Sequence, residues 1–427
     1  MNFTYLKLED TNVLKFNTSE RIYEIQNASL LPFSLRNNIV DTRSLATKND
    51  NEKLNILFHN QETLSYFFYN RTLSVNRENA KYIMNQLHIK QNNDFETRYK
   101  AMILCKALSV SDNYWITNDV KEQWKDVNLK SNPLHETLQQ IALFGKTLSI
   151  TGKLHTPELT NQGAYAKAWY RENDELYLYK ASTIGGNESE REVLASKILD
   201  CFNIPHVPYE LTKKEDKLVC KCANMNLENT SIVDAVEYDV WCSKKGKNVF
   251  DEAVKIDSDV FYKTIIADYL LSNSDRHLSN WGFFMDNKSG EIIRLHPLFD
   301  HNNAFDKNFM REPNGGHCQL IPGKTQKEAA LYALKRCDFR CIKPVTKDMF
   351  FDKEMYQTFM SRACELGLYQ NRKVSVLEYI MNKNITEYEP KSIKPDNTQE
   401  YWKSIQNFQS KQRDKNVNLE FVISIKE

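Results

Sequence analysis

The chain has 427 residues, of which 57 are Lys or Arg and 56 are Asp or Glu. This length is enough for two or three domains, and the balanced charge gives no global field that would draw the protein to nucleic acid or to a membrane. Its nine cysteines lack the paired spacing of a structural zinc site, so we expect reduced thiols that are mostly buried. Since it also lacks an apolar signal core and a membrane-spanning run, we expect a soluble, cytoplasmic protein.

The first 145 residues predict a mixed α/β region without a catalytic constellation. Weak alternation over residues 3–25 indicates short strands, and apolar positions spaced by three to four residues predict helices near 79–87 and 98–108. The polar stretch 42–53 is predicted to be a loop. Three conspicuous residues are interpreted as structural, two as surface salt bridges and one as a core indole: Arg71, Arg77 and Trp115.

From residue 146 the pattern changes to that of a β-rich segment. Short strands are predicted over 147–152 and 176–180, and between them a turn containing Gly163 leads into a further strand that ends at Trp169. The backbone N–H groups of such a turn can cover phosphates, and Lys180, at the end of its strand, can bind them.

Residues 185–199 begin with two glycines and are predicted to continue as a helix that stops before Asn203, with three acidic residues in its first turns, where the helix dipole alone would favour them. Lys180 needs a carboxylate partner. Glu192 has the spacing of the buried face and is our choice for this ion pair, and Glu188 is the alternative. Two more strands are predicted, over 209–211 and 218–222.

Residues 232–272 are predicted to be helical and lead into residues 273–282, which have the form N-x-D-R-H-x-x-N-x-G. Apolar segments on either side of a polar turn then predict a hairpin that returns Asp300 to this loop. Phosphoryl transfer from ATP needs one carboxylate that orients the attacking hydroxyl, and a carboxamide and a second carboxylate that hold Mg²⁺. Asp275 fits the first role, and Asn280 and Asp300 fit the second.

With Asp300 downstream, residues 273–282 resemble the catalytic and metal-binding loops of the HipA-like kinases. These are bacterial Ser/Thr kinases whose core is distantly similar to phosphatidylinositol 3- and 4-kinases. The resemblance implies an α+β, two-lobed protein-kinase-like fold. It would comprise an N-terminal accessory region (1–145), a small β-rich lobe (146–225) and a large, mostly helical lobe (226–427). The implied cofactors are ATP and Mg²⁺.

The resemblance also implies roles in the small lobe. The spacing from Gly163 to Lys167 resembles the phosphate loop of these kinases. Thr160, three residues before Gly163, stands where the family carries a hydroxyl that is autophosphorylated. The strand over 218–222 would lead into the hinge between the lobes. There the backbone groups of Lys221, Cys222 and Ala223 are expected to bind the adenine edge.

Three histidines accompany the catalytic motif. His277 is expected to orient the Asp275 loop, while His296 and His301 flank Asp300 either as partners of the metal carboxylate or as structural residues. Residues 306–324 are predicted to form a loop near the active site. The remainder is predicted to contain three helices, over 327–336, 353–366 and 374–382. A charged tail and a final strand over 419–425 are predicted to follow.

The function that we expect is an ATP- and Mg²⁺-dependent Ser/Thr protein kinase that acts as a toxin or growth regulator on a protein hydroxyl, with a helix-turn-helix antitoxin as a candidate partner. Direct nucleic-acid binding is not expected. The likeness to phosphatidylinositol kinases leaves a lipid or small-molecule kinase as one alternative. The other is a non-catalytic, nucleotide-binding interaction module that is partnered by a DNA-binding antitoxin.

Overall fold

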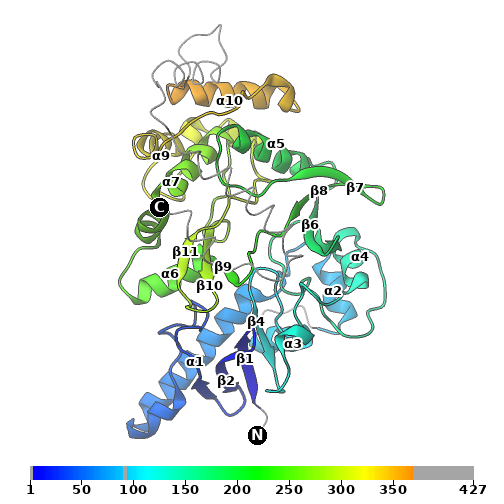
Figure 1. The fold of residues 1–427 in the computed structure, drawn as a ribbon, viewed down its shortest axis with the longest axis vertical. Helices are drawn as coiled ribbons and strands as arrows, with labels where there is room; N and C mark the ends of the chain where they lie inside the picture. The colour runs from blue at the N-terminus through cyan, green and yellow to red at the C-terminus, as the bar shows by residue number, and fades with distance from the viewer. Residues whose placement is uncertain (1–2, 90–93, 369–427) are drawn as a thin grey trace. The chain divides into compact units, whose positions relative to one another are not determined.

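The computed structural model describes residues 3–89 and 94–368. In these ranges the chain is mixed α/β, with three antiparallel sheets and helices between them (Figure 1). The chain divides into two compact units. Unit 1 runs up to Glu190 and also includes Tyr209–Ile256 and Leu278–His296, and unit 2 comprises Arg191–Pro208, Asp257–His277 and the chain from Pro297 onward. The mixed α/β class is confirmed, while the two-lobed layout and its boundaries at 145 and 225 stay predictions.

The first sheet of unit 1 confirms the strands predicted near the N-terminus. Its order is β3-β2-β1-β4, and all its neighbours are antiparallel. Trp115 on the last of these strands is fully buried and donates its indole N–H to the Glu9 carbonyl at 2.7 Å, as expected of a core indole. The strands are β1 (Thr4–Leu8), β2 (Thr11–Asn17), β3 (Ile22–Ile25) and β4 (Tyr114–Thr117).

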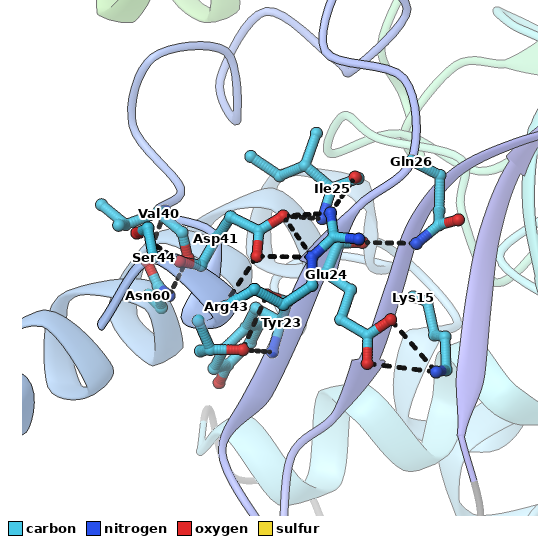
Figure 2. A network of polar contacts seen from close by, with 11 residues as sticks. Lys15, Tyr23, Glu24, Ile25, Gln26, Val40, Asp41, Arg43, Ser44 and Asn60 are labelled. Atoms are coloured by element: carbon cyan, nitrogen blue, oxygen red, sulfur yellow. Dashed lines mark hydrogen bonds and ion pairs between the residues drawn. The ribbon is translucent and has the colours of Figure 1, made fainter. Parts of the chain in front are cut away.

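Polar contacts tie β3 to the segment that follows it (Figure 2). The Asp41 carboxylate accepts the backbone N–H of Ile25 at 3.0 Å and pairs with the Arg43 guanidinium, which also donates to the Ile25 carbonyl at 2.8 Å. The Asn60 carboxamide bonds to both backbone groups of Val40, at 2.8 and 2.7 Å. These contacts fix the path of the chain between the sheet and the first helix.

The prediction of a loop over 42–53 is wrong. A 3₁₀ helix forms over Thr42–Thr47, and α1 (Asp50–Arg71) begins three residues later, where Asn49 and Glu52 cap it reciprocally. The exposed Leu54 and Phe58 on this polar helix blur the periodicity that would have predicted it. The shorter helices are α2 (Ala80–Gln86), α3 (Phe95–Leu104) and α4 (Glu136–Phe144). α2 matches its prediction, α3 begins and ends a few residues earlier than predicted, and α4 was not predicted.

Arg71 and Arg77 are structural, but they are not surface residues. Arg71 is 9% exposed and pairs with both oxygens of Asp112, at 2.5 and 2.6 Å. Arg77 is 3% exposed and pairs with Glu158, which is fully buried. The nine cysteines are reduced thiols, as expected, and seven of them are buried.

A second sheet, with the order β5-β6-β8-β7, carries the predicted nucleotide-binding strands. The strands predicted over 176–180, 209–211 and 218–222 are confirmed. The strand predicted over 147–152 is wrong, because that stretch runs exposed and irregular without a partner strand to pair its backbone. The elements are β5 (Lys167–Glu172), β6 (Glu175–Ala181), β7 (Glu210–Lys214) and β8 (Lys217–Ala223).

The third sheet contains the predicted hairpin, β10 (Gly282–Asp286) and β11 (Ile292–Leu295), and adds β9 (Thr230–Asp234) beside β10. The first residues of the predicted helical stretch 232–272 are therefore strand, and the helices α6 (Ala235–Lys244) and α7 (Val249–Leu270) follow. Gly282, the last residue of the catalytic motif, permits close pairing, because a Cβ there would lie 2.2 Å from the Val233 carbonyl oxygen.

Unit 2 is mainly helical. It takes most of α5 (Glu188–Cys201), the part of α7 after the non-helical Asp257, and three later helices around a core that includes Phe305 and Phe359. The predicted helices over 327–336 and 353–366 are confirmed, while the predictions for 374–382 and 419–425 lie outside the described residues. The later helices are α8 (Lys307–Met310), α9 (Gln326–Ala333) and α10 (Lys353–Glu365). None of the described helices is long and apolar enough to cross a bilayer.

Candidate active site

Two buried lysines lie opposite each other at one end of the β5–β8 sheet. Lys167 of β5 is in register with Lys180 of β6, and the two side chains are 8% and 6% exposed. Directly opposed residues of an antiparallel pair share one face of the sheet, with Cβ atoms about 4.5–5.5 Å apart. Like charges in this arrangement destabilise a sheet. The pair therefore concentrates positive charge on one face, as a phosphate-binding site requires.

Gly163 lies against the first of these lysines. Its φ is +96°, a conformation that other residues rarely adopt, and an added Cβ would lie 2.3 Å from Lys167 Nζ. The absence of a side chain thus lets the ammonium group approach the backbone of the turn. The structure brings together three residues that were assigned to phosphate binding from the sequence, namely Gly163, Lys167 and Lys180.

The end of β6 is tied to the start of α5. Lys180 Nζ lies 5.2 Å from the centre of the Tyr209 ring, and its carbonyl accepts the Ser189 hydroxyl at 3.1 Å. The Glu188 carboxylate accepts the hydroxyl and the backbone N–H of Thr183, at 2.8 and 3.2 Å. Because Glu188 is engaged on this turn, Glu192 is the better candidate to pair with Lys180, and the pair itself stays a prediction.

Thr160, the proposed autophosphorylation site, is buried. Its hydroxyl lies 2.6 Å from the Leu108 carbonyl and 3.1 Å from the Pro157 carbonyl. A phosphate group in this position would lose both hydrogen bonds and bury a charge, so this segment must move before Thr160 can be modified. The modification stays a prediction.

The predicted adenine-binding backbone lies in β8, between β6 and β7. Lys221 pairs with both neighbours, whereas Cys222 and Ala223 extend past the end of β7. The Lys221 ammonium pairs with Glu210 at 3.0 Å and with Glu172 at 3.4 Å, and the Glu210 contact raises the pKa of Lys221. Its side chain is thus engaged within the sheet. Adenine binding by these three backbones stays a prediction.

In unit 2, the loop that carries Asp275 is anchored by its neighbour Arg276. The buried Arg276 guanidinium makes hydrogen bonds to both oxygens of Asp268, with a shortest distance of 3.0 Å, and donates to the Phe299 carbonyl at 3.1 Å. It also lies 2.9 Å from Nε2 of His301. Because a guanidinium can only donate, this nitrogen of His301 is the acceptor and the ring proton is on Nδ1. His301 is therefore a structural partner of the loop.

The peptide after Asp300 is held by Glu192. The backbone N–H of His301 donates to Glu192 Oε1 at 2.7 Å, and the Glu192 side chain is fully buried. Asp300 itself has φ +60°, a left-handed conformation that aspartate adopts more readily than most residues other than glycine. The Asn302 carboxamide donates to Asp300 Oδ1 at 2.8 Å.

The Asp275 carboxylate is oriented by two neighbours. Asn303 donates to its Oδ2 at 2.8 Å, and Nε2 of His277 lies 3.6 Å from Oδ1. The His277 contact agrees with its expected orienting role. Asn303 was not singled out from the sequence, because a carboxamide that follows Asp300 by three residues has no distinctive spacing.

Two glutamines hold the backbone before Asp275. Gln326 donates to the Asn273 carbonyl at 2.7 Å, and Gln319 donates to the Ser274 carbonyl at 2.8 Å. Both come from the segment around α9, more than forty residues along the chain. Sequence reasoning missed them, together with Asp268, since nothing in their local pattern marks them as neighbours of the loop.

The donor set fits the implied ligands. A carboxamide oxygen (Asn280, 5% exposed) and a carboxylate (Asp300) are hard oxygen donors of the kind that Mg²⁺ prefers, and the ammonium groups of Lys167 and Lys180 suit phosphates. Asp275, Asp300 and Glu192 belong to unit 2, and Lys180 and Asn280 belong to unit 1. The convergence of these groups on one nucleotide stays a prediction.

Residues 163–325 match the model of a family described as HipA-like kinase. This match spans the Gly163 turn, the catalytic motif and Asp300, and it confirms the resemblance predicted from those residues. This segment of the chain is similar to the HipA-like kinases, and the match supports a kinase function.

Solved structures that are similar to the chain include the following two. HipA of Shewanella oneidensis MR-1, in a toxin–antitoxin complex with HipB and operator DNA, is 12% identical with a TM-score of 0.47, over 86% of this chain and 97% of that one. The Helicobacter pylori proinflammatory kinase CtkA is 16% identical with a TM-score of 0.34, over 52% of this chain and 95% of that one. No curated protein matches the sequence.

Proposed function

We propose that the protein is an ATP- and Mg²⁺-dependent Ser/Thr protein kinase. The observation that carries the proposal is the register pairing of two buried lysines, Lys167 and Lys180, beside the Gly163 turn. Two ammonium groups on one face of a sheet, next to a turn of exposed backbone, suit the phosphates of a nucleotide.

The residues of unit 2 would then act on the substrate hydroxyl. Asp275 orients the hydroxyl and accepts its proton, while Asn303 and His277 keep the carboxylate in place. Asn280 and Asp300 would hold Mg²⁺, which would supply positive charge to offset the charge that develops on the phosphates. Glu192 keeps the Asp300 backbone in place through His301.

The cellular role that we propose is that of a toxin or growth regulator, with a helix-turn-helix antitoxin as partner. This part rests on the resemblance to the HipA-like kinases. A lipid or small-molecule kinase and a non-catalytic nucleotide-binding module are the alternatives. In the first alternative the phosphate of ATP is transferred to a lipid or small molecule, and in the second it is not transferred at all.

Incubation of the purified protein with γ-labelled ATP, Mg²⁺ and cell lysate tests the proposal. We expect label in protein bands, at Ser or Thr, for the wild type and none above background for Asp275→Asn. The matched control is Asp338→Asn, which changes an exposed aspartate whose carboxylate pairs with Arg340 at the surface, and which should retain full activity. Label that appears in extracted lipid instead would favour the lipid kinase.

A binding measurement separates the third alternative. Titration with Mg-ATP should give saturable binding to both the wild type and Asp275→Asn, and much weaker binding to Lys180→Met. Nucleotide binding without transfer to any fraction would favour the non-catalytic module. A wild type that fails to bind Mg-ATP would contradict all three functions.

A further inference from the structure

The loop that covers the proposed phosphate site is bound along its length by an earlier segment of the chain. Residues 158–167, here called the phosphate loop, meet residues 72–78 through two backbone hydrogen bonds. Leu73 N donates to the Leu159 carbonyl at 2.7 Å, and Glu78 N donates to the Ala164 carbonyl at 2.8 Å. The Gln162 carboxamide also donates to the Thr72 carbonyl. These contacts lie on both sides of Gly163.

Arg77 is at the centre of this contact. Its buried guanidinium donates to three backbone carbonyls, those of Glu158 and Asn161 at 3.3 Å each and that of Lys167. Asn161 precedes the Gly163 turn, and Lys167 is the first residue of β5 after it. One side chain therefore joins the two ends of the phosphate loop.

Glu158 completes the arrangement. One carboxylate oxygen accepts from Arg77 at 3.2 Å, and the other accepts the backbone N–H of Trp169 at 2.9 Å. Both side chains are fully buried, and burial raises the pKa of Glu158 and lowers that of Arg77. A buried ion pair adds little net stability, because desolvation of the two charges offsets their attraction. Its main effect here is to fix geometry.

The position of Lys167 depends directly on these bonds, because Arg77 binds its carbonyl oxygen and its ammonium group lies against Gly163. A displacement of about 1 Å at a group that positions a substrate can lower a rate on the order of a hundredfold. The contacts of Arg77 thus act on phosphate binding without contact to the nucleotide.

We propose that Arg77 is a positioning residue for the phosphate loop and that residues 72–78 clamp this loop in its nucleotide-binding conformation. This inference rests on the proposed kinase function for its effect on ATP. The clamp itself is a property of the fold and has a readout of its own, the protection of the loop amides from hydrogen exchange.

The first test compares the full-length wild type with Arg77→Met. Hydrogen exchange followed by mass spectrometry should show the amides of residues 159–168 exchanging at least about tenfold faster in the variant. The KM for ATP should rise at least about tenfold, with a smaller change in kcat, because the loop binds phosphates in the ground state as well as the transition state. Arg77→Lys keeps a single ammonium group as donor, so its loop exchange rate and its KM for ATP should lie between those of the wild type and those of Arg77→Met.

A second variant separates positioning from folding, since Arg77→Met leaves Glu158 buried without its cation. In Arg77→Met/Glu158→Gln no charge is left unpaired, and the glutamine oxygen can still accept from Trp169. We expect its melting temperature to return toward that of the wild type, while the loop amides stay fast and the KM for ATP stays high, because the hydrogen bonds from Arg77 to the carbonyls of Asn161 and Lys167 are still missing.

Arg71→Met serves as the matched control. Arg71 is an equally buried arginine of the same region, paired with Asp112 and with the carbonyls of Ala107 and Tyr114. Its loss should lower the melting temperature and leave both the loop exchange and the KM for ATP unchanged.

The outcomes distinguish the two proposals. Wild-type protection of residues 159–168 together with a wild-type KM in the double variant would overturn the clamp, even if the protein is a kinase. Fast loop exchange in both Arg77 variants would support the clamp as a structural device, whether or not the wild type binds ATP. If the wild type does not bind ATP, the proposed kinase function is wrong, and so is the proposed effect of the clamp on ATP binding.

Discussion

The backbone N–H of His301 donates a hydrogen bond to Glu192 Oε1 at 2.7 Å, which joins α5 to the peptide that follows Asp300. The contact gives Glu192 a role that does not depend on Lys180. A hydrogen bond to a buried charged acceptor contributes about 1.5–3 kcal/mol.

The two roles of Glu192 can be separated by substitution. Glu192→Gln keeps an acceptor for the His301 N–H but loses the charge, whereas Glu192→Ala loses both. We expect kcat/KM to fall about tenfold in the first variant and about a hundredfold or more in the second, in line with the loss of one or two such interactions. Equal losses in the two variants would argue against the His301 contact. Glu188→Gln, on the Thr183 turn, should have little effect.

Two consecutive asparagines should affect different steps. Asn303 donates to Asp275 and Asn302 donates to Asp300, both at 2.8 Å. Asn303→Ala is expected to lower kcat about tenfold at saturating Mg²⁺, as loss of one hydrogen bond to a charged group predicts. Asn302→Ala should instead raise the Mg²⁺ concentration that gives half-maximal activity. Steady-state assays over a Mg²⁺ series measure both, and identical profiles would contradict the separate roles.

Arg276 and Asp268 should be essential to the stability of unit 2. Their side chains are 2% and 5% exposed, so Asp268→Asn leaves a buried guanidinium without its counter-charge. Removal of one partner of such a pair costs about 3–5 kcal/mol. The control Arg311→Met breaks an exposed ion pair with Glu354 and should cost less than about 1 kcal/mol. Denaturant unfolding of both variants measures the difference, and equal small losses would show that the buried pair is dispensable.

Stability should fall as the pH rises towards neutrality. Burial, with Glu237 and Asp112 nearby, raises the pKa of Asp234 from its usual 3.8 to about 7 in the folded protein. The folded state therefore binds this proton more tightly than the unfolded state, so its contribution is complete below about pH 4 and is lost as the pH rises through about 7.

Thermal melts from pH 5 to pH 8 check this prediction. In Asp234→Asn the side chain at position 234 is neutral at every pH. The melting temperature of this variant should therefore fall less from pH 5 to pH 8 than that of the wild type. Some slope should remain, because burial also raises the pKa of Glu237. Asp338→Asn, at an exposed site, should keep the wild-type slope. If the melting temperature of Asp234→Asn fell with pH as steeply as that of the wild type, Asp234 would not be the source of the pH dependence.

The elements that sequence patterns predict well are those with strong local signals. β6 alternates and carries Lys180 next to its last residue, α5 begins with acidic residues, and the hairpin around β10 has apolar runs on either side of a turn. The prediction of a strand over 147–152 is wrong because alternation is a property of one segment, whereas a strand also needs a neighbouring strand to pair with. Leu148 in this stretch is 38% exposed.

The contacts that hold the site together could not be predicted from local patterns. Glu192 and His301 are more than a hundred residues apart, and Arg77 and Glu158 are about eighty apart. Such pairs follow from the topology of the chain, which periodicity does not encode. The roles of Asp275 and Asn280 can be predicted from the sequence because the two residues are close together in one loop, and these roles stay predictions. The residues that hold this loop come from distant segments.

The order in which the chain is made gives the contact between residues 72–78 and 158–167 a further consequence. The ribosome releases the first segment well before the second, so the earlier segment is available as a template when the later one emerges. A recombinant fragment that begins near residue 146 would lack that template and would carry Glu158 without the arginine that neutralises it. Such a fragment should aggregate or misfold, and expression of the kinase segment alone is the wrong route to an active preparation.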